Sequence, residues 1–179
     1  MRLDSLIHLA KAVLAMAEVD RVVVFGSASL LAKFPELGDS EETPFSQTYD
    51  ADLIPFPFEE EIGLMLDEAF GEDRVFHQRF GYHADIVRPV VAETFPAKWE
   101  ERLILLPDVE GVECLEPHDM AAVKCLIGRE KDRTQLRYLI AAGLLDTRVV
   151  KERLTEIRMT EKQILSSHRF LRELSIGTR

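Results

Sequence analysis

In the first third of the chain, segments with apolar residues at helical spacing alternate with strand-like apolar runs. Residues 3–17 place leucine, isoleucine, valine and alanine at helical spacing, which predicts an amphipathic helix. Residues 21–25 are a β-branched run that stops at Gly26, which predicts a buried strand. Residues 27–33 predict a short apolar helix directly after it. Residues 50–56 predict a second strand, which prolines close.

A polar stretch separates the two predicted strands. Residues 35–48 contain two prolines and a glycine among mostly polar side chains, which predicts a loop. After the second strand, residues 59–61 are three consecutive glutamates. Because the helix dipole favours negative charge at a helix start, they predict a helix that Gly71 ends.

The middle of the chain predicts further short strands. Residues 74–80 and 82–88 look extended and are split by Gly81, which predicts a hairpin or two neighbouring strands. Residues 103–106 and 112–115 are shorter strand candidates around a turn.

Beyond residue 117 every periodic segment has helical spacing. Pro117 suits the first turn of a helix whose apolar face lies within residues 120–127. Asp146 is a predicted N-cap for a later helix. Thr160 and Gln163 have capping-box spacing before the last apolar period.

These patterns predict an α/β (α+β) domain over residues 1–116 and a helical subdomain over residues 117–179. The charge changes sign near the same point. Residues 1–119 hold 9 Lys and Arg against 25 Asp and Glu, whereas residues 120–179 hold 13 against 7. The basic half is suited to attract a nucleotide or another polyanion. The alternative is that its cations line solvated helix faces.

Composition bounds the class of protein and its compartment. No apolar run approaches the roughly 20 residues that span a bilayer. The N-terminus lacks a basic segment followed by an apolar core, so we expect no export signal. Cys114 and Cys125 are the only thiols and lack CxxC spacing, which favours a reduced, cytoplasmic setting.

Two features near the first two strands carry candidate chemistry. Gly26-Ser27 ends the first strand, and a glycine there lets a phosphate approach the backbone at the start of a helix. An ordinary tight turn is the alternative. Asp50 and Asp52 alternate on the second strand, so both side chains point to one face about 6.5–7 Å apart. Two like charges there require a compensating cation, unless the segment is a solvated edge strand or loop.

A third carboxylate, Asp85, interrupts an apolar run. Such a run normally carries no charge on a buried face. The alternative is that Asp85 lies on the solvent-exposed face of a half-buried sheet. His83 shares its strand face, which allows a supporting role. His77, His83 and His118 show no spacing that converges on zinc.

The combination resembles a known superfamily. Gly-Ser after one strand, Asp-x-Asp on the next and a lone aspartate on a later strand resemble the nucleotidyltransferases that include DNA polymerase beta. The helical stretch from residue 115 to residue 132, with Lys124 and then Arg129-Glu130-Lys131-Asp132, is similar to a bacterial branch. That branch holds uncharacterised nucleotidyltransferase-like proteins and abortive-infection type IV toxin-like enzymes.

The resemblance implies a nucleotidyltransferase-type mixed sheet with flanking helices, followed by a helical segment. It also implies that Asp50 and Asp52 coordinate two Mg²⁺ ions, and that Asp85 binds one metal and helps to deprotonate an acceptor hydroxyl. Gly26 and Ser27 are implied to hold the triphosphate of an NTP. Two cations about 3.5–4 Å apart stabilise both ends of a phosphoryl transfer, and carboxylates are ligands that Mg²⁺ prefers.

Two lysines of the helical half are further nucleotide-binding candidates. Lys124 and Lys131 are expected to reach the β- and γ-phosphates. For Lys124 the alternative is an exposed flank of its helix. For Arg129, Lys131 and Asp132 the alternative is a salt-bridge network that ties the helices to the sheet.

Three functions are open at this point. The first is an enzyme that moves an NMP group from an NTP to an RNA end, a protein hydroxyl or a small molecule. The second is a non-catalytic nucleotide-binding or regulatory protein, such as one member of a toxin–antitoxin or defence pair. Besides the NTP and its acceptor, the expected partners are an antitoxin or a second copy of the chain. The regulatory alternative is motivated by the acidic first half and by the loop over residues 35–48, which is longer than the family pattern usually has between the glycine turn and the Asp-x-Asp strand. In the third, the acids merely line a surface.

Overall fold

The computed structural model describes residues 1–40, 42–46 and 48–176. The chain forms two compact units. The sheet unit comprises Met1–Val91 and Leu103–Leu115, and the helical unit comprises Ala92–Arg102 and Glu116–Arg179. The predicted domain bounds at residues 116 and 117 stay a prediction.

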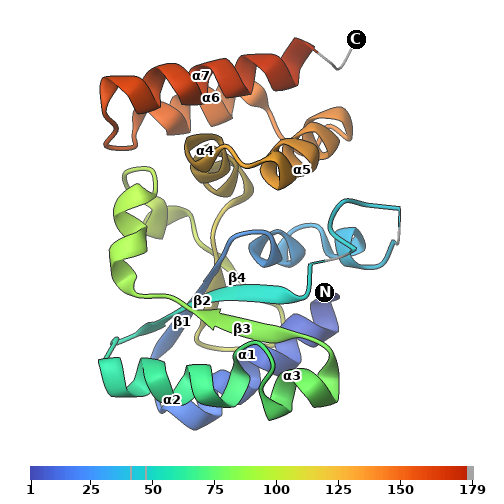
Figure 1. The fold of residues 1–179 in the computed structure, drawn as a ribbon, viewed down its shortest axis with the longest axis vertical. Coiled ribbons are helices and arrows are strands. Elements are labelled where there is room, and N and C mark those ends of the chain that lie inside the picture. The colour runs from blue at the N-terminus through green and yellow to red at the C-terminus, as the bar shows by residue number, and fades with distance from the viewer. Residues whose placement is uncertain (41, 47, 177–179) are drawn as a thin grey trace. The chain divides into compact units, whose positions relative to one another are not determined.

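A five-stranded mixed sheet forms the centre of the sheet unit (Figure 1). Its strands are β1 Arg21–Phe25, β2 Asp50–Phe56, β3 His83–Ile86, β4 Ile104–Leu105 and β5 Val112–Cys114. Their order is β3-β2-β1-β5-β4. The pairs β1–β2 and β4–β5 are antiparallel, whereas β2–β3 and β1–β5 are parallel. The predicted fold class, a mixed α/β structure of the nucleotidyltransferase type, is confirmed.

Helices α1 (Leu3–Ala17), α2 (Glu60–Phe70) and α3 (Val75–Phe80) lie together on one face of this sheet (Figure 1). The apolar period of α1 buries Leu6 and Leu9 completely, as its helical spacing predicts. Burial of each such leucine stabilises the unit by about 1.5–3 kcal/mol.

The prediction for residues 74–80 is wrong, because this segment is the helix α3 rather than a strand. There is also no hairpin at this point, since β3 pairs with β2 in parallel. Gly81 ends α3 with a left-handed φ of 78° and donates its N–H to His77 O at 2.8 Å.

The reason lies in the aromatic residues of α3. Phe76 and Phe80 are four residues apart, so a helix places both rings on one side. Both rings contact the ring of His8 from α1, with centroids 5.4 and 4.7 Å away. Tertiary packing of this kind overrides the strand preference of isolated aromatic and β-branched residues.

The segments between β1 and β2 are short 3-10 helices. Ala28–Ala32 forms η1 and Pro35–Gly38 forms η2. The predicted short helix after Gly26 is therefore present, although it is a single 3-10 segment. The predicted loop over residues 35–48 begins with η2, and residues 41 and 47 lie outside the described residues.

The helical unit contains four α-helices. They are α4 Pro117–Ile127, α5 Glu130–Ala141, α6 Thr147–Thr155 and α7 Glu161–Ile176. Two predicted caps are confirmed: the Asp146 side chain accepts from Arg148 N at 2.8 Å, and Thr160 N donates to Gln163 Oε1 at 2.9 Å. The helical nature of this half was therefore readable from local signals.

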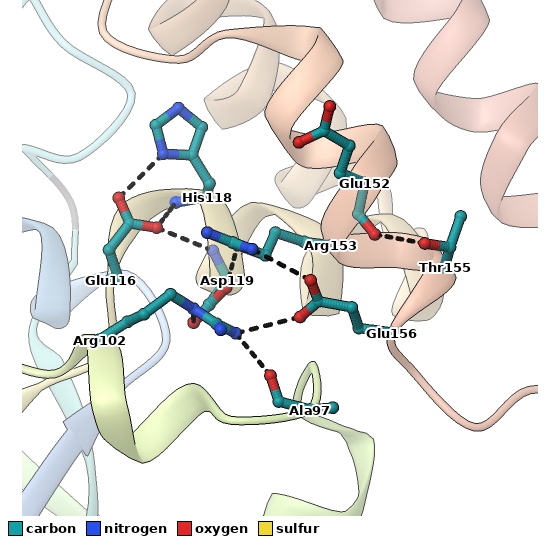
Figure 2. Close-up of polar contacts among 9 residues, drawn as sticks. All are labelled: Ala97, Arg102, Glu116, His118, Asp119, Glu152, Arg153, Thr155 and Glu156. Carbon is teal, nitrogen blue, oxygen red and sulfur yellow. Dashed lines mark hydrogen bonds and ion pairs between the residues drawn. The ribbon is translucent and has the colours of Figure 1, made fainter.

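A buried carboxylate ties the segment Ala92–Arg102 to α4 and α6 (Figure 2). Asp119 is fully buried, and Arg102 Nε donates to its Oδ2 at 2.8 Å. Arg153 Nε lies 3.0 Å from Asp119 Oδ1 as an ion pair whose angles fall outside those of a hydrogen bond. Glu156 contacts both arginines from the other side. A buried charge is tolerated because such partners compensate it.

No helix in the described part of the chain is both long and apolar enough to cross a bilayer. Cys114 and Cys125 are free and buried, and burial raises the pKa of each thiol to about 12. Both side chains are therefore unreactive thiols at neutral pH.

Candidate functional site

The turn after β1 and the second strand meet at one contact. Gly26 has a φ of 66°, a left-handed conformation that glycine adopts without a steric penalty. A Cβ atom added to Gly26 would lie 2.1 Å from Asp52 Oδ2. Only glycine therefore lets the Asp52 carboxylate rest against this turn. Phe25 and Asp52 are partners in the antiparallel pairing of β1 and β2, so the backbone of Asp52 lies next to the residue before Gly26.

The three predicted acids lie on two neighbouring strands. In the parallel pair β2–β3, Asp52 is opposite Asp85 and Asp50 is opposite His83. Residues two apart on a strand share a face, and adjacent strands are about 4.8 Å apart. Asp50, Asp52 and Asp85 therefore share one face of the sheet, together with His83. The intervening Ala51 is fully buried.

Electrostatics couple the members of this group. Burial raises the pKa of Asp85, and the negative charge of Asp50 raises it further. His83 opposes the shift, because its Nε2 lies 3.6 Å from Asp85 Oδ1. Asp85 is still half-exposed, whereas His83 is buried. His83 therefore lies beside Asp85, and its supporting role stays a prediction.

The donor set matches Mg²⁺ in its chemistry, because all three residues offer carboxylate oxygens. In the part of the chain that the structure describes, no group of three His, Cys, Asp or Glu side chains is already gathered as a metal cage. The strand register brings the three backbones together, and the side chains of Asp50 and Asp52 each have further interactions. The metal role of the three acids stays a prediction.

The phosphate role of the glycine turn also stays a prediction. Ser29 Oγ donates to Gly26 O at 2.8 Å, and this hydrogen bond stabilises the turn. Because η1 is a five-residue 3-10 segment, it contributes less dipole to this site than the helix predicted from sequence.

Replacing Asp85 with asparagine is expected to raise the melting temperature at pH 7. The folded protein holds the pKa of Asp85 above its ordinary value, so ionisation of this carboxyl costs stability. The gain is therefore present at neutral pH and disappears on acidification below about pH 4, where both states bind the proton. Thermal melts at several pH values measure it, with exposed Asp4→Asn as control. A lower melting temperature for Asp85→Asn at pH 7 contradicts this assignment.

Lys124 is not on an exposed helix flank, so that alternative is wrong. Its side chain is buried, and its Nζ donates to Asp132 Oδ1 at 2.7 Å and to Gln135 Oε1 at 2.8 Å. Arg129 Nε donates to the other Asp132 oxygen at 2.9 Å. This salt-bridge network links α4 to α5. Lys131 is exposed.

The network sets the ionisation of its members. Burial raises the pKa of Asp132, but the hydrogen bond from Arg129 and the charge of Lys124 outweigh it and hold the pKa below its ordinary value. Burial lowers the pKa of Lys124, and Asp132 counteracts that effect. The carboxylate form of Asp132 is therefore the one that the fold stabilises, and this contribution to stability is lost as the pH falls through the lowered pKa.

Lys124→Met is expected to lower the free energy of unfolding by about 2 kcal/mol, because hydrogen bonds to a buried charge are lost while Arg129 still compensates Asp132. Chemical denaturation measures it. Lys131→Met removes an exposed ammonium from the same unit and is expected to change the value by less than about 1 kcal/mol. Unchanged stability in Lys124→Met together with weaker NTP binding would instead assign this ammonium to the phosphates.

The buried role of Asp119 has no clear signal in the sequence. Its only signal was an acid in the first turn of a helix, where the dipole commonly explains a solvated carboxylate. The partners that reveal its burial, Arg102 and Arg153, lie 17 and 34 positions away along the chain. No local pattern connects them.

The sequence model of a family described as "Nucleotidyltransferase of unknown function (DUF6036)" matches residues 1–175 of the chain. No curated protein and no solved structure gave a match. The matched range includes the glycine turn, the three acids and the Lys124 network.

Proposed function

The chain belongs to this family of nucleotidyltransferases of unknown function, and on that premise we propose that it moves an NMP group from an NTP to a hydroxyl acceptor. Pyrophosphate leaves. The proposed metal ligands are Asp50, Asp52 and Asp85, for Mg²⁺.

One observation carries this proposal. The register of β2 and β3 places Asp52 opposite Asp85, and the Asp52 carboxylate rests on the glycine turn at Gly26. If the acids were unrelated surface residues, there would be no reason for a left-handed glycine at this position. Gly26 is compatible with the Asp52 carboxylate only because it has no Cβ atom. The arrangement supports a shared site for phosphate and divalent cation.

In the proposed reaction, Asp85 acts as the base that accepts the proton of the acceptor hydroxyl. The acceptor oxygen forms a bond to the α-phosphorus while the bond from that phosphorus to the pyrophosphate oxygen breaks. The hydroxyl proton passes to the Asp85 carboxylate, whose raised pKa brings it closer to that of an effective base. Bound Mg²⁺ supplies neutralisation of the charge on the transferring phosphate.

Backbone N–H groups at Gly26 and Ser27 orient the triphosphate in this proposal, because a glycine lets phosphate oxygens approach the chain closely. The ammonium of Lys124 is already held by Asp132, so the proposal needs no contribution from it. Lys131 is exposed, and its contact with the phosphates stays a prediction.

The proposal is tested with NTPs that carry label on the α-phosphate. The protein is incubated with Mg²⁺, each common ribonucleoside triphosphate and three acceptor classes: RNA, protein and small hydroxyl compounds. Label on one acceptor with equimolar pyrophosphate is the expected result. Mg²⁺-dependent NTP binding without pyrophosphate release in any arm overturns it and supports the regulatory alternative.

A further inference from the structure

A basic groove lies between α6 and α7 of the helical unit. Its lining includes the cations Arg148 and Lys151 from α6 and Arg169 and Arg172 from α7, together with His168, around a volume of about 520 Å³. None of the described residues that line the groove is acidic. This concentration of positive charge stands out in a chain whose net charge is -10.

The cations are arranged in pairs along each wall. Arg148 and Lys151 are three residues apart on α6, and Arg169 and Arg172 are three residues apart on α7. Residues at this spacing lie on one side of a helix and are about 4.5 Å apart along its axis. Two rows of charge therefore face the groove, instead of one cluster around a single anion.

Three of these cations are not consumed by intramolecular ion pairs. Lys151, Arg169 and Arg172 are exposed and make no ion pair with any other described residue. Arg148 is engaged, because its Nη2 lies 2.8 Å from Asp146 Oδ2. By contrast, Arg133 of α5 pairs with Glu173 of α7 at 2.8 Å.

We propose that the α6–α7 groove binds the sugar–phosphate backbone of a nucleic acid strand. Successive phosphates along a strand match cations repeated along both walls, whereas a lone phosphate would use only one pair. A lipid surface is flat and suits a protruding basic face better than a concave one. The inference stands on the groove alone; joined to the proposed function, it makes the bound strand the acceptor.

The test is fluorescence anisotropy with a labelled single-stranded RNA of about 20 nucleotides and with DNA of the same sequence, between about 50 and 200 mM KCl. Arg169→Glu/Arg172→Glu is expected to weaken binding at least about tenfold and to make the salt slope shallower by about 1.4, as for two lost phosphate contacts. The matched control, Arg158→Glu/Lys162→Glu, makes the same charge change at exposed cations of the same unit outside the groove lining. It is expected to weaken binding less than threefold.

The RNA and DNA arms decide which strand is preferred. Equal weakening by both double variants overturns the proposal, because the overall field of the unit would then explain binding. Binding to phosphatidylserine vesicles without binding to RNA or DNA overturns it in favour of a membrane. Asp52→Asn must keep full affinity for the strand, and Arg169→Glu/Arg172→Glu must keep Mg²⁺-dependent NTP binding. These two variants separate a failure of the groove from a failure of the proposed transfer. Circular dichroism confirms that each variant folds.

Discussion

Asp52→Asn is expected to lower the rate of nucleotidyl transfer at least about 10³-fold. The amide keeps the size of the side chain but removes the charge that a divalent cation needs, and Asp52 is the acid in contact with the glycine turn. The measurement is single-turnover transfer of α-labelled NMP under saturating Mg²⁺. Because one of several like charges is removed, the variant is expected to melt no lower than the native protein.

Asp4→Asn is the control for this variant. Asp4 is exposed in the first turn of α1 and lies outside the acid group, so its substitution is expected to leave transfer unchanged. Native transfer rates in Asp52→Asn would falsify the assignment of the site. Loss of transfer in both variants would point to a general dependence on surface charge.

Gly26→Ala is expected to lower the rate of nucleotidyl transfer as much as Asp52→Asn does. It is also expected to lower the free energy of unfolding by about 2–4 kcal/mol. Two effects add here. A φ of 66° strains any residue with a Cβ, and the new Cβ would lie 2.1 Å from Asp52 Oδ2, so the carboxylate must move. Denaturant titration and the labelled transfer assay measure the two losses on the same preparation.

Gly81→Ala separates strain from displacement. Gly81 has a similar φ of 78° in the same unit, and no atom lies within 4 Å of its added Cβ. This variant is expected to lose about 1–2 kcal/mol of stability and to keep full transfer activity. If the two alanine variants prove equal in stability and activity, contact with Asp52 has no functional meaning.

The sequence by itself predicted the elements whose signals are local. The apolar period of α1, the β-branched run of β1 and the caps at Asp146 and Thr160 each involve residues at most a few positions apart. Local signals also placed Asp50 and Asp52 on one face of one strand, since strand alternation needs no tertiary information. The predicted nucleotidyltransferase resemblance is confirmed by the family match.

Tertiary structure decided what depends on partners far along the chain. It turned residues 75–80 into a helix, because their rings pack on His8 of α1 rather than on a neighbouring strand. It also buried Lys124 against Asp132, where the sequence predicted a phosphate ligand with an exposed helix flank as the alternative.

The proximity of the acids also depends on tertiary structure. Asp52 and Asp85 are 33 positions apart, and only the parallel register of β2 and β3 makes them neighbours. The sequence determined which residues carry the charge and which turn carries the glycine. The pairing of the strands decided that Asp52 and Asp85 lie opposite one another. Strands pair through backbone hydrogen bonds, so the local sequence does not specify the register in this sheet.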